Sequence, residues 1–291
     1  MNVAQRPSLI DLALRQVARL PLAWFRGAGW LLGVVLSVLA WPRRRVVVRN
    51  LKHCFPERAP GWHRRTTRLV FVHFAQSWFD RIWLWHGDEG ILAKRLQCRI
   101  SGAAWDSACV LFAPHCMGLD AGWTALTLTQ KQPMVTLFAN TSSPQQDRWI
   151  ASGRSRFAPQ GLLPRVGSAK TVVRRLREGS SLYLLPDMDL GAKDAVFVPF
   201  MGRSAATVTA LPRFASLGQV GVRSVYTLMT ASGYTTEVGE VWPNYPSGDD
   251  LSDAARMNAH LDQWVEQHPD QYYWVHRRFK TRQGNDLDIY A

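Results

Sequence analysis

From residue 109 onward, short apolar runs of strand length alternate with segments of helical periodicity, an order typical of layered α/β folds. Pro, Gly or polar residues bound each run, as they do at strand ends. We expect a mostly parallel mixed sheet flanked by helices, with an antiparallel edge. The expected strands are 109–113, 134–139, 181–185, 220–229 and 235–242, and the expected helices are 170–178 and 252–267, with Ser252 as the N-cap of the last.

The stretch 110–123, VLFAPHCMGLDAGW, places a His and an Asp between a buried strand and a helix. Pro114 and Gly118 suit a turn at the carboxyl edge of a sheet, where α/β enzymes tend to expose chemistry. Positions five apart lie about 140° apart around a helix, so His115 and Asp120 can meet only if His115 lies in the turn. We interpret His115 as a general base and Asp120 as the carboxylate that orients it. Such a spacing is common by chance, and a His satisfied by a neighbouring carbonyl is the alternative.

A loop-like segment at 140–165 carries arginines that could bind an anion. Guanidinium groups make forked contacts with phosphate or carboxylate, so Arg154, Arg156 and Arg165 are candidates for binding phosphate or an oxyanion. A solvated basic face is the competing interpretation.

Two acids, Asp187 and Asp189, follow the expected strand 181–185 and should therefore lie at the same sheet edge. No third ligand stands at a recognisable spacing, so we expect no metal here. The two carboxylates are instead expected to form hydrogen bonds and to orient nearby Arg side chains.

The chain is strongly basic, with 35 Lys and Arg against 22 Asp and Glu and a formal net charge of +13. This excess indicates an anionic partner, which could be nucleic acid, anionic lipid or an acidic carrier protein. The tail at 271–282, QYYWVHRRFKTR, alternates aromatic and basic residues. Its Arg277, Arg278 and Lys280 are candidates for contacting an anionic acceptor, a lipid headgroup or a nucleic acid.

Residues 1–45 are expected to attach the chain to a membrane, and 46–291 to form the catalytic domain. The first 19 residues fit a basic amphipathic helix, and 20–41 carry a single charge, Arg26, which at this position can snorkel to the headgroups. A spanning anchor, an in-plane helix and a cleaved signal peptide all fit this pattern. The absence of a small-residue cleavage site disfavours the signal peptide. The basic block that follows places the rest of the chain in the cytoplasm if the segment spans.

An aromatic-rich helix is expected at 62–86, where the rings belong either to the core or to the wall of an apolar-chain site. The cysteines form no CxxC pair and are expected to be reduced thiols. A nucleophilic role for Cys116, beside His115, is disfavoured because neighbours in sequence rarely point at each other.

Taken together, these segments resemble the bacterial lipid A biosynthesis acyltransferases, the late lauroyl and myristoyl transferases. The matching segments are RNLKHCFPE at 49–57, His115-x4-Asp120, GRSR at 153–156, PDMD at 186–189 followed by VFVPF, and YYWVHRRFKTR at 272–282. Many members carry an Arg-Pro pair after the strand at 135–138, where this chain has Ala139 and Asn140.

The resemblance implies a glycerolipid-acyltransferase-like α/β fold at the bacterial inner membrane, with the catalytic domain facing the cytoplasm. It implies transfer from acyl carrier protein to a hydroxyl of a phosphorylated, Kdo-bearing lipid A precursor, with no cofactor and no nucleic-acid partner. His115 would be the base, Asp120 its orienter, and Arg154, Arg156 and Arg165 the phosphate or oxyanion region. Another membrane lipid acceptor, or a basic membrane-peripheral binding protein without catalysis, are the rival interpretations.

Overall fold

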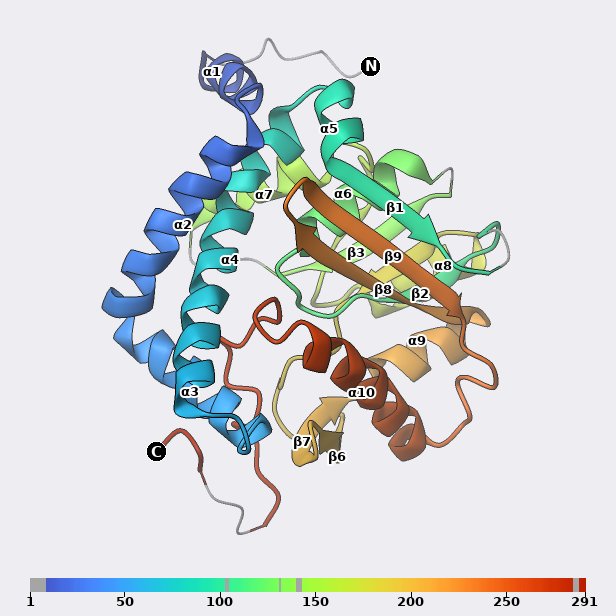
Figure 1. Ribbon diagram of the computed structural model, residues 1–291. Helices are drawn as coiled ribbons and strands as arrows, with labels where there is room; N and C mark the ends of the chain where they lie inside the picture. The colour runs from blue at the N-terminus through green and yellow to red at the C-terminus, as the bar shows by residue number, and fades with distance from the viewer. Residues whose placement is uncertain (1–8, 103–104, 131, 140–142, 285–287) are drawn as a thin grey trace.

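A seven-stranded sheet forms the centre of the computed structural model, which describes residues 9–102, 105–130, 132–139, 143–284 and 288–291 (Figure 1). The strand order is β1-β9-β8-β2-β5-β3-β4, and every neighbouring pair is parallel except β8 and β9. The predicted α/β class with a mostly parallel sheet is therefore confirmed. The strands are β1 Leu96–Ile100, β2 Cys109–Phe112, β3 Met134–Phe138, β4 Leu162–Pro164, β5 Ser181–Leu184, β6 Ala195–Phe200, β7 Arg203–Val208, β8 Gly221–Thr230 and β9 Gly233–Val241, with β6 and β7 forming a separate antiparallel pair.

Helices cover both faces of this sheet. The chain moves from β2 to β3 through α6 and on to β4 through α7, then returns to β5 through α8 and to β8 through α9. Because such crossovers are right-handed, the two directions place α6 and α7 on one face and α8 and α9 on the other. The helices are α1 Leu9–Ala18, α2 Leu22–Leu39, α3 Trp41–Cys54, α4 Pro60–His86, α5 Glu89–Arg95, α6 Leu119–Thr129, α7 Pro144–Arg154, α8 Ala169–Arg177, α9 Ala210–Gly218 and α10 Asp250–Gln267.

The apolar helix α2 lies along α4, which itself contacts α6 and α7 (Figure 1). Gly29 and Gly33 allow this approach, since a Cβ at Gly33 would stand 2.4 Å from the Val72 Cα atom. Within the described residues α2 is the one helix long and apolar enough to cross a membrane, and 22% of it is buried. The exposed face keeps large apolar side chains, among them Trp24 and Trp30. Residues 1–8 of the expected anchoring segment lie outside the described range.

Arg26, which could snorkel towards lipid headgroups from its place in the sequence, binds within the protein instead. Its guanidinium group lies 3.2 Å from the carboxylate of Asp80 in α4 and donates to the carbonyl of Gly233. Asp80 is fully buried and also accepts from the Trp83 indole and the Tyr234 hydroxyl. The single charge of α2 therefore fastens this helix to the body of the protein.

Two local expectations also differ from the structure. The segment expected to be a loop contains the helix α7, which begins after Ser143, whose hydroxyl accepts from the amide of Gln146. The N-cap of α10 is Asp249 instead of Ser252, and its carboxylate accepts from two amides of the first turn. Polar composition concealed α7, because a short helix with one buried edge shows little apolar periodicity.

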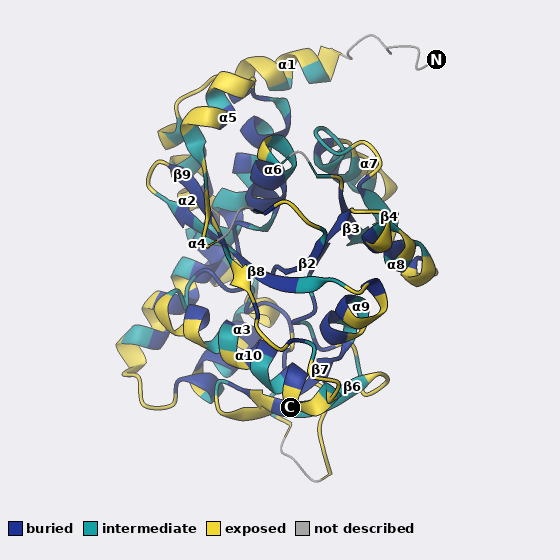
Figure 2. Cartoon of the chain, turned by 90° about the vertical axis from the view of Figure 1, so that its right-hand side faces the viewer, coloured by how far each residue is buried: buried dark blue, intermediate teal, exposed yellow. Residues whose placement is uncertain are grey.

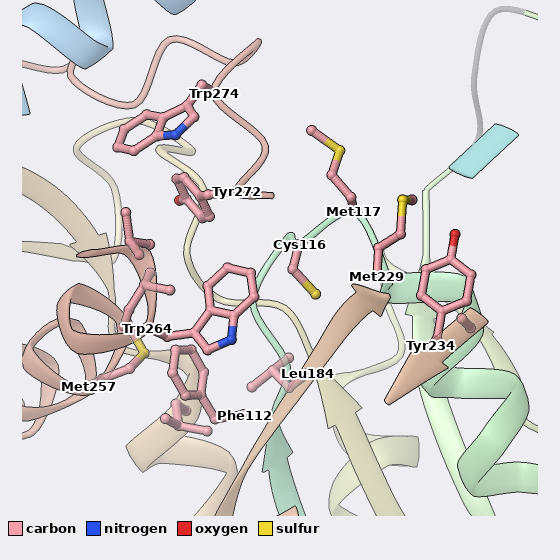
Figure 3. Close-up of a cluster of buried hydrophobic side chains, with 14 of the residues drawn as sticks. Phe112, Cys116, Met117, Leu184, Met229, Tyr234, Met257, Trp264, Tyr272 and Trp274 are labelled. Carbon is pink, nitrogen blue, oxygen red and sulfur yellow. The ribbon is translucent and has the colours of Figure 1, made fainter. Parts of the chain in front are cut away.

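Buried residues gather on β2, β3 and α6 at the centre of the molecule (Figure 2). The same core includes residues of α4 and of the C-terminal segment. The tail expected to be a binding surface supplies part of this core. Tyr272 and Trp274 pack with Cys116, Phe112 and Trp264 in one cluster (Figure 3). The rings of the C-terminal motif are therefore largely structural.

Candidate active site

The turn between β2 and α6 presents His115 at the carboxyl edge of the sheet, as expected. His115 lies in the turn, and Asp120 lies in the first turn of α6, which begins at Leu119. Gly118 is required by close approach, because a Cβ there would stand 2.4 Å from the carbonyl oxygen of Thr227. The sequence therefore located the turn and its residues correctly.

The carboxylate that contacts His115 is Asp187, not Asp120. The Nδ1 atom of His115 lies 2.8 Å from Oδ1 of Asp187, and the His115 amide donates to both carboxylate oxygens at 3.1 Å. The Tyr272 hydroxyl donates to Oδ2 at 3.0 Å. Asp187 follows β5, the direct neighbour of β2 in the sheet. The expected partner of His115, Asp120, is therefore corrected to Asp187, which lies 72 positions after His115 in the chain.

Electrostatics determine which group of this pair donates the hydrogen bond and which accepts it. Burial favours the neutral acid, but the facing imidazole and its hydrogen bonds outweigh burial and lower the pKa of Asp187 to about 2. An ionised carboxylate can only accept, so Nδ1 of His115 carries a hydrogen and Nε2 is the nitrogen left to accept a proton. An imidazole held in this way by a buried carboxylate can act as a general base.

Asp120 instead organises two guanidinium groups. Its Oδ2 accepts from Nε of Arg81 at 2.7 Å and forms an ion pair with Nη2 of the same residue at 2.7 Å. Its Oδ1 accepts from Nε of Arg154 at 2.7 Å. Burial alone would raise the pKa of Asp120, but the charges of Arg154 and Arg81 hold that pKa far below its usual value. Trp78 lies under Arg81, with the guanidinium carbon 3.8 Å from a ring centroid.

Both clusters line a single cavity of about 650 Å³. Its polar wall contains His115, Asp120, Arg81, Arg154 and Arg165. Most of its other lining side chains are apolar and come from α4, α6, α7, α9 and the ends of β3 and β5, among them Phe74, Trp78, Trp123, Phe138, Ile150, Met188 and Phe214. The rings of α4 therefore contribute partly to the wall of this site.

The predicted arginines separate in the structure. Arg154 lies beside Asp120, and Arg165 is exposed at the rim of the cavity, near Ala139; Asn140 lies outside the described residues. Arg156 does not line this cavity and instead faces a second one with Arg15, Arg19 and His86. Gly153 is needed for close packing, since a Cβ there would stand 2.1 Å from the Trp85 ring.

The C-terminal candidates are not at the site. Arg278 is fully buried and donates to the carbonyl of Ala206 and the hydroxyl of Thr207, so its expected role in acceptor binding is wrong. Arg277 and Lys280 are exposed outside the cavity lining. Asp189 accepts from the amide and hydroxyl of Thr281, which ties the loop after β5 to the tail.

Two residues of the site were missed in the sequence. Arg81 lies inside an aromatic helix whose rings were assigned to the core or to the wall of an apolar-chain site. Tyr272 lies inside a tail that was interpreted as a binding surface through its basic residues. The available signals were the charged neighbours Asp80 and Arg81 inside the aromatic run of α4, and the hydroxyl group of Tyr272. Cys116 is buried in the cluster of Figure 3, and burial raises the pKa of its thiol to about 11, which leaves it protonated at neutral pH. Among the described residues, no group of three His, Cys, Asp or Glu is placed to hold a metal ion.

Comparison with known proteins assigns the chain to a family. The family model described as bacterial lipid A biosynthesis acyltransferase matches residues 6–281. A lipid A biosynthesis palmitoleoyltransferase of Escherichia coli is 26% identical over 89% of this chain and 87% of its own length. A lipid A biosynthesis acyltransferase of Haemophilus influenzae is 29% identical over 88% of this chain and 82% of its own length. The lipid A biosynthesis myristoyltransferase of Escherichia coli is 26% identical over 85% of this chain and 78% of its own length.

Proposed function

This chain belongs to the bacterial lipid A biosynthesis acyltransferases, and from that premise we propose how and on what it acts. The proposed reaction moves a fatty acyl group from the thioester of an acyl carrier protein to a hydroxyl on a 3-hydroxyacyl chain of a Kdo-bearing lipid A precursor. The observation that carries this proposal is His115 in the wall of a largely apolar cavity, paired with the buried Asp187.

The proposed step is direct. Nε2 of His115 takes the proton of the acceptor hydroxyl as its oxygen attacks the thioester carbonyl carbon, and a carbon–oxygen bond forms. The tetrahedral intermediate then expels the thiolate, which recovers the proton from the imidazolium. A thioester is already activated and its thiol leaves readily, so this route requires neither a metal nor a redox cofactor.

The arginines beside Asp120 are proposed to stabilise the oxyanion or a phosphate of the acceptor. Asp120 engages Nε of both Arg81 and Arg154, which fixes the two side chains at the cavity wall. Nη1 of Arg81 is buried without a hydrogen-bond partner among the described residues, so it can donate a hydrogen bond to a bound substrate. A single oxyanion donor commonly contributes about 3 kcal/mol of transition-state stabilisation.

We also propose that the protein acts at the cytoplasmic face of the inner membrane. The support is the exposed apolar face of α2, with Trp24, Trp30 and Leu31 each more than half exposed, together with the net charge of +13. Indole rings favour the headgroup level, and basic proteins are attracted to anionic leaflets.

Purified protein in detergent, given an acyl carrier protein thioester and the lipid A precursor, should add one acyl chain of defined mass, read by mass spectrometry. A parallel reaction offers a lysoglycerophospholipid as the acceptor. Acylation of the lysophospholipid alone would overturn the proposed acceptor, and no transfer to either lipid would overturn the proposed reaction.

A further inference from the structure

The helix α8 is strongly basic, and within the described part of the chain its side chains form a single ion pair, that of Arg174 with Glu178. Lys170, Arg174, Arg175 and Arg177 lie in its nine residues, without an acidic residue in the first turn. Lys170 is exposed in that first turn, where the helix dipole disfavours a cation. The ion pair of Arg174 with Glu178 is exposed and 3.8 Å long, so it contributes little.

Exposed apolar side chains border this helix. Val166, just before α8, is 85% exposed, and Leu217 of the neighbouring helix α9 is 53% exposed. Arg177 donates to the carbonyl of Leu217, which joins the two helices into one surface. Basic side chains around exposed apolar ones suit a soluble partner with an acidic, partly apolar contact face.

The position of α8 separates this surface from the membrane. The helix begins four residues after Arg165, and Arg165 lines the rim of the cavity. The helix α2, with its exposed apolar face, packs on α4 outside the opposite face of the sheet. Figure 1 shows α2 at the left edge of the molecule and α8 on the other side of the sheet. An anionic lipid headgroup bound through α2 would therefore not reach α8.

We propose that α8, with Val166 and Leu217, is the docking surface for the acidic carrier protein that delivers the acyl thioester. The proposal rests on the proposed function and adds where the donor binds: the carrier occupies the α8 side of the cavity and the lipid acceptor enters from the α4 side. Charge complementarity would act mainly on encounter and on the KM for the carrier, with the chemical step unchanged.

The test is the double variant Lys170→Glu, Arg174→Glu in detergent solution, assayed with two donors. One donor is the acyl carrier protein thioester, and the other is the same acyl group on uncharged pantetheine. We expect the KM for the carrier donor to rise about tenfold or more and to lose most of its salt dependence. The KM and kcat with the pantetheine donor should stay close to those of the unmodified protein.

The matched control is Arg64→Glu, Arg65→Glu, which makes the same charge change on exposed residues of α4. An unchanged KM for the carrier in the α8 variant, or an equal rise in the control, would overturn the docking surface. If the unmodified protein transfers the acyl group from pantetheine but not from the carrier, the docking surface would be overturned as well, whereas the proposed acyl transfer itself would stand. Absence of transfer from both donors would instead refute the proposed function.

Discussion

His115 is held by a fully buried, ionised carboxylate, so its replacement should affect chemistry more than stability. We expect His115→Ala to lower kcat by about 10²–10⁴, the usual range for loss of a general base. The measurement is steady-state turnover with the carrier donor. Cys116→Ala is the neighbouring control and should remain near full activity, because the buried thiol is protonated. Retained turnover in His115→Ala, or an acyl-cysteine trapped at Cys116, would exclude the proposed base.

Tyr272 is a positioning residue for Asp187. Its hydroxyl donates to Oδ2, and a β-bridge between Cys116 and Tyr272 fixes the tail against the catalytic turn. In Tyr272→Phe the carboxylate loses one donor, so its negative charge favours the protonated imidazole more strongly. The acidic limb of the kcat/KM profile should therefore move to higher pH. The control is Tyr245→Phe, because Tyr245 is another buried tyrosine whose hydroxyl donates to a carbonyl. This variant should lose similar stability, but the pH profile of its kcat/KM should not move. Identical pH profiles in the two variants would contradict a positioning role for Tyr272.

Arg278 shows that a basic residue in an aromatic tail need not bind a ligand. It is fully buried, stacks on Phe200 and donates to Ala206 and Thr207. Arg278→Ala should lower the free energy of unfolding by about 3 kcal/mol, since truncation leaves a cavity and an unpaired carbonyl. Exposed Arg277→Ala should change it by less than about 0.5 kcal/mol. Chemical denaturation distinguishes the two, and equal, small effects would contradict the structural role.

At this scale the sequence predicted residue types better than their partners. His115, Asp120, Arg154 and Asp187 were all selected, and all four belong to the site. The pairing of His115 with Asp187 depends on β5 lying next to β2, and strand order is not encoded in the spacing of either motif. Arg156 stood two residues from Arg154, but the end of α7 turns the two side chains towards different cavities.

Elements with a strong local pattern were predicted almost to the residue. The strands β2, β3 and β5 are apolar runs, and the helix α8 is sharply amphipathic, so periodicity alone identified them. The antiparallel pair β6 and β7 was missed, because Pro199 interrupts the apolar run of β6 and β7 combines exposed polar residues with small ones. The position of α2 against α4 depends on a tertiary ion pair at Arg26, which hydrophobicity cannot indicate.

The packing of α2 on α4 can be tested with two glycines of the same helix. Gly33 touches the backbone of Val72, whereas Gly27 has open space around its Cβ direction. Gly33→Ala should destabilise the protein by about 1–3 kcal/mol through overpacking. Gly27→Ala should be neutral or stabilise by up to about 1 kcal/mol through helix propensity. Thermal unfolding in detergent compares them, and equal shifts would show that α2 does not pack closely.

The whole molecule has two differently built sides. The outer face of α2 is apolar and rich in indole, while α8, across the sheet, is basic. The cavity is lined by α4, α6 and α7 from the side of α2 and by α9 from the side of α8, so it lies between these two sides. An enzyme that joins a lipid acceptor to a soluble donor benefits from this separation, because each substrate can approach without displacing the other.

Membrane binding and carrier binding should therefore respond to different substitutions. Trp24→Ser, Trp30→Ser removes two exposed indoles from α2, and since burying a large apolar side chain contributes about 1.5–3 kcal/mol, vesicle affinity should fall at least tenfold. Flotation with phosphatidylglycerol vesicles measures this, with the pantetheine assay in detergent as a check on folding. The double variant at Lys170 and Arg174 should float nearly as well as the unmodified protein, because α8 lies across the sheet from the indoles. Equal loss of flotation in both variants would mean that one surface serves both partners, and the separation of donor and acceptor sides would then be wrong.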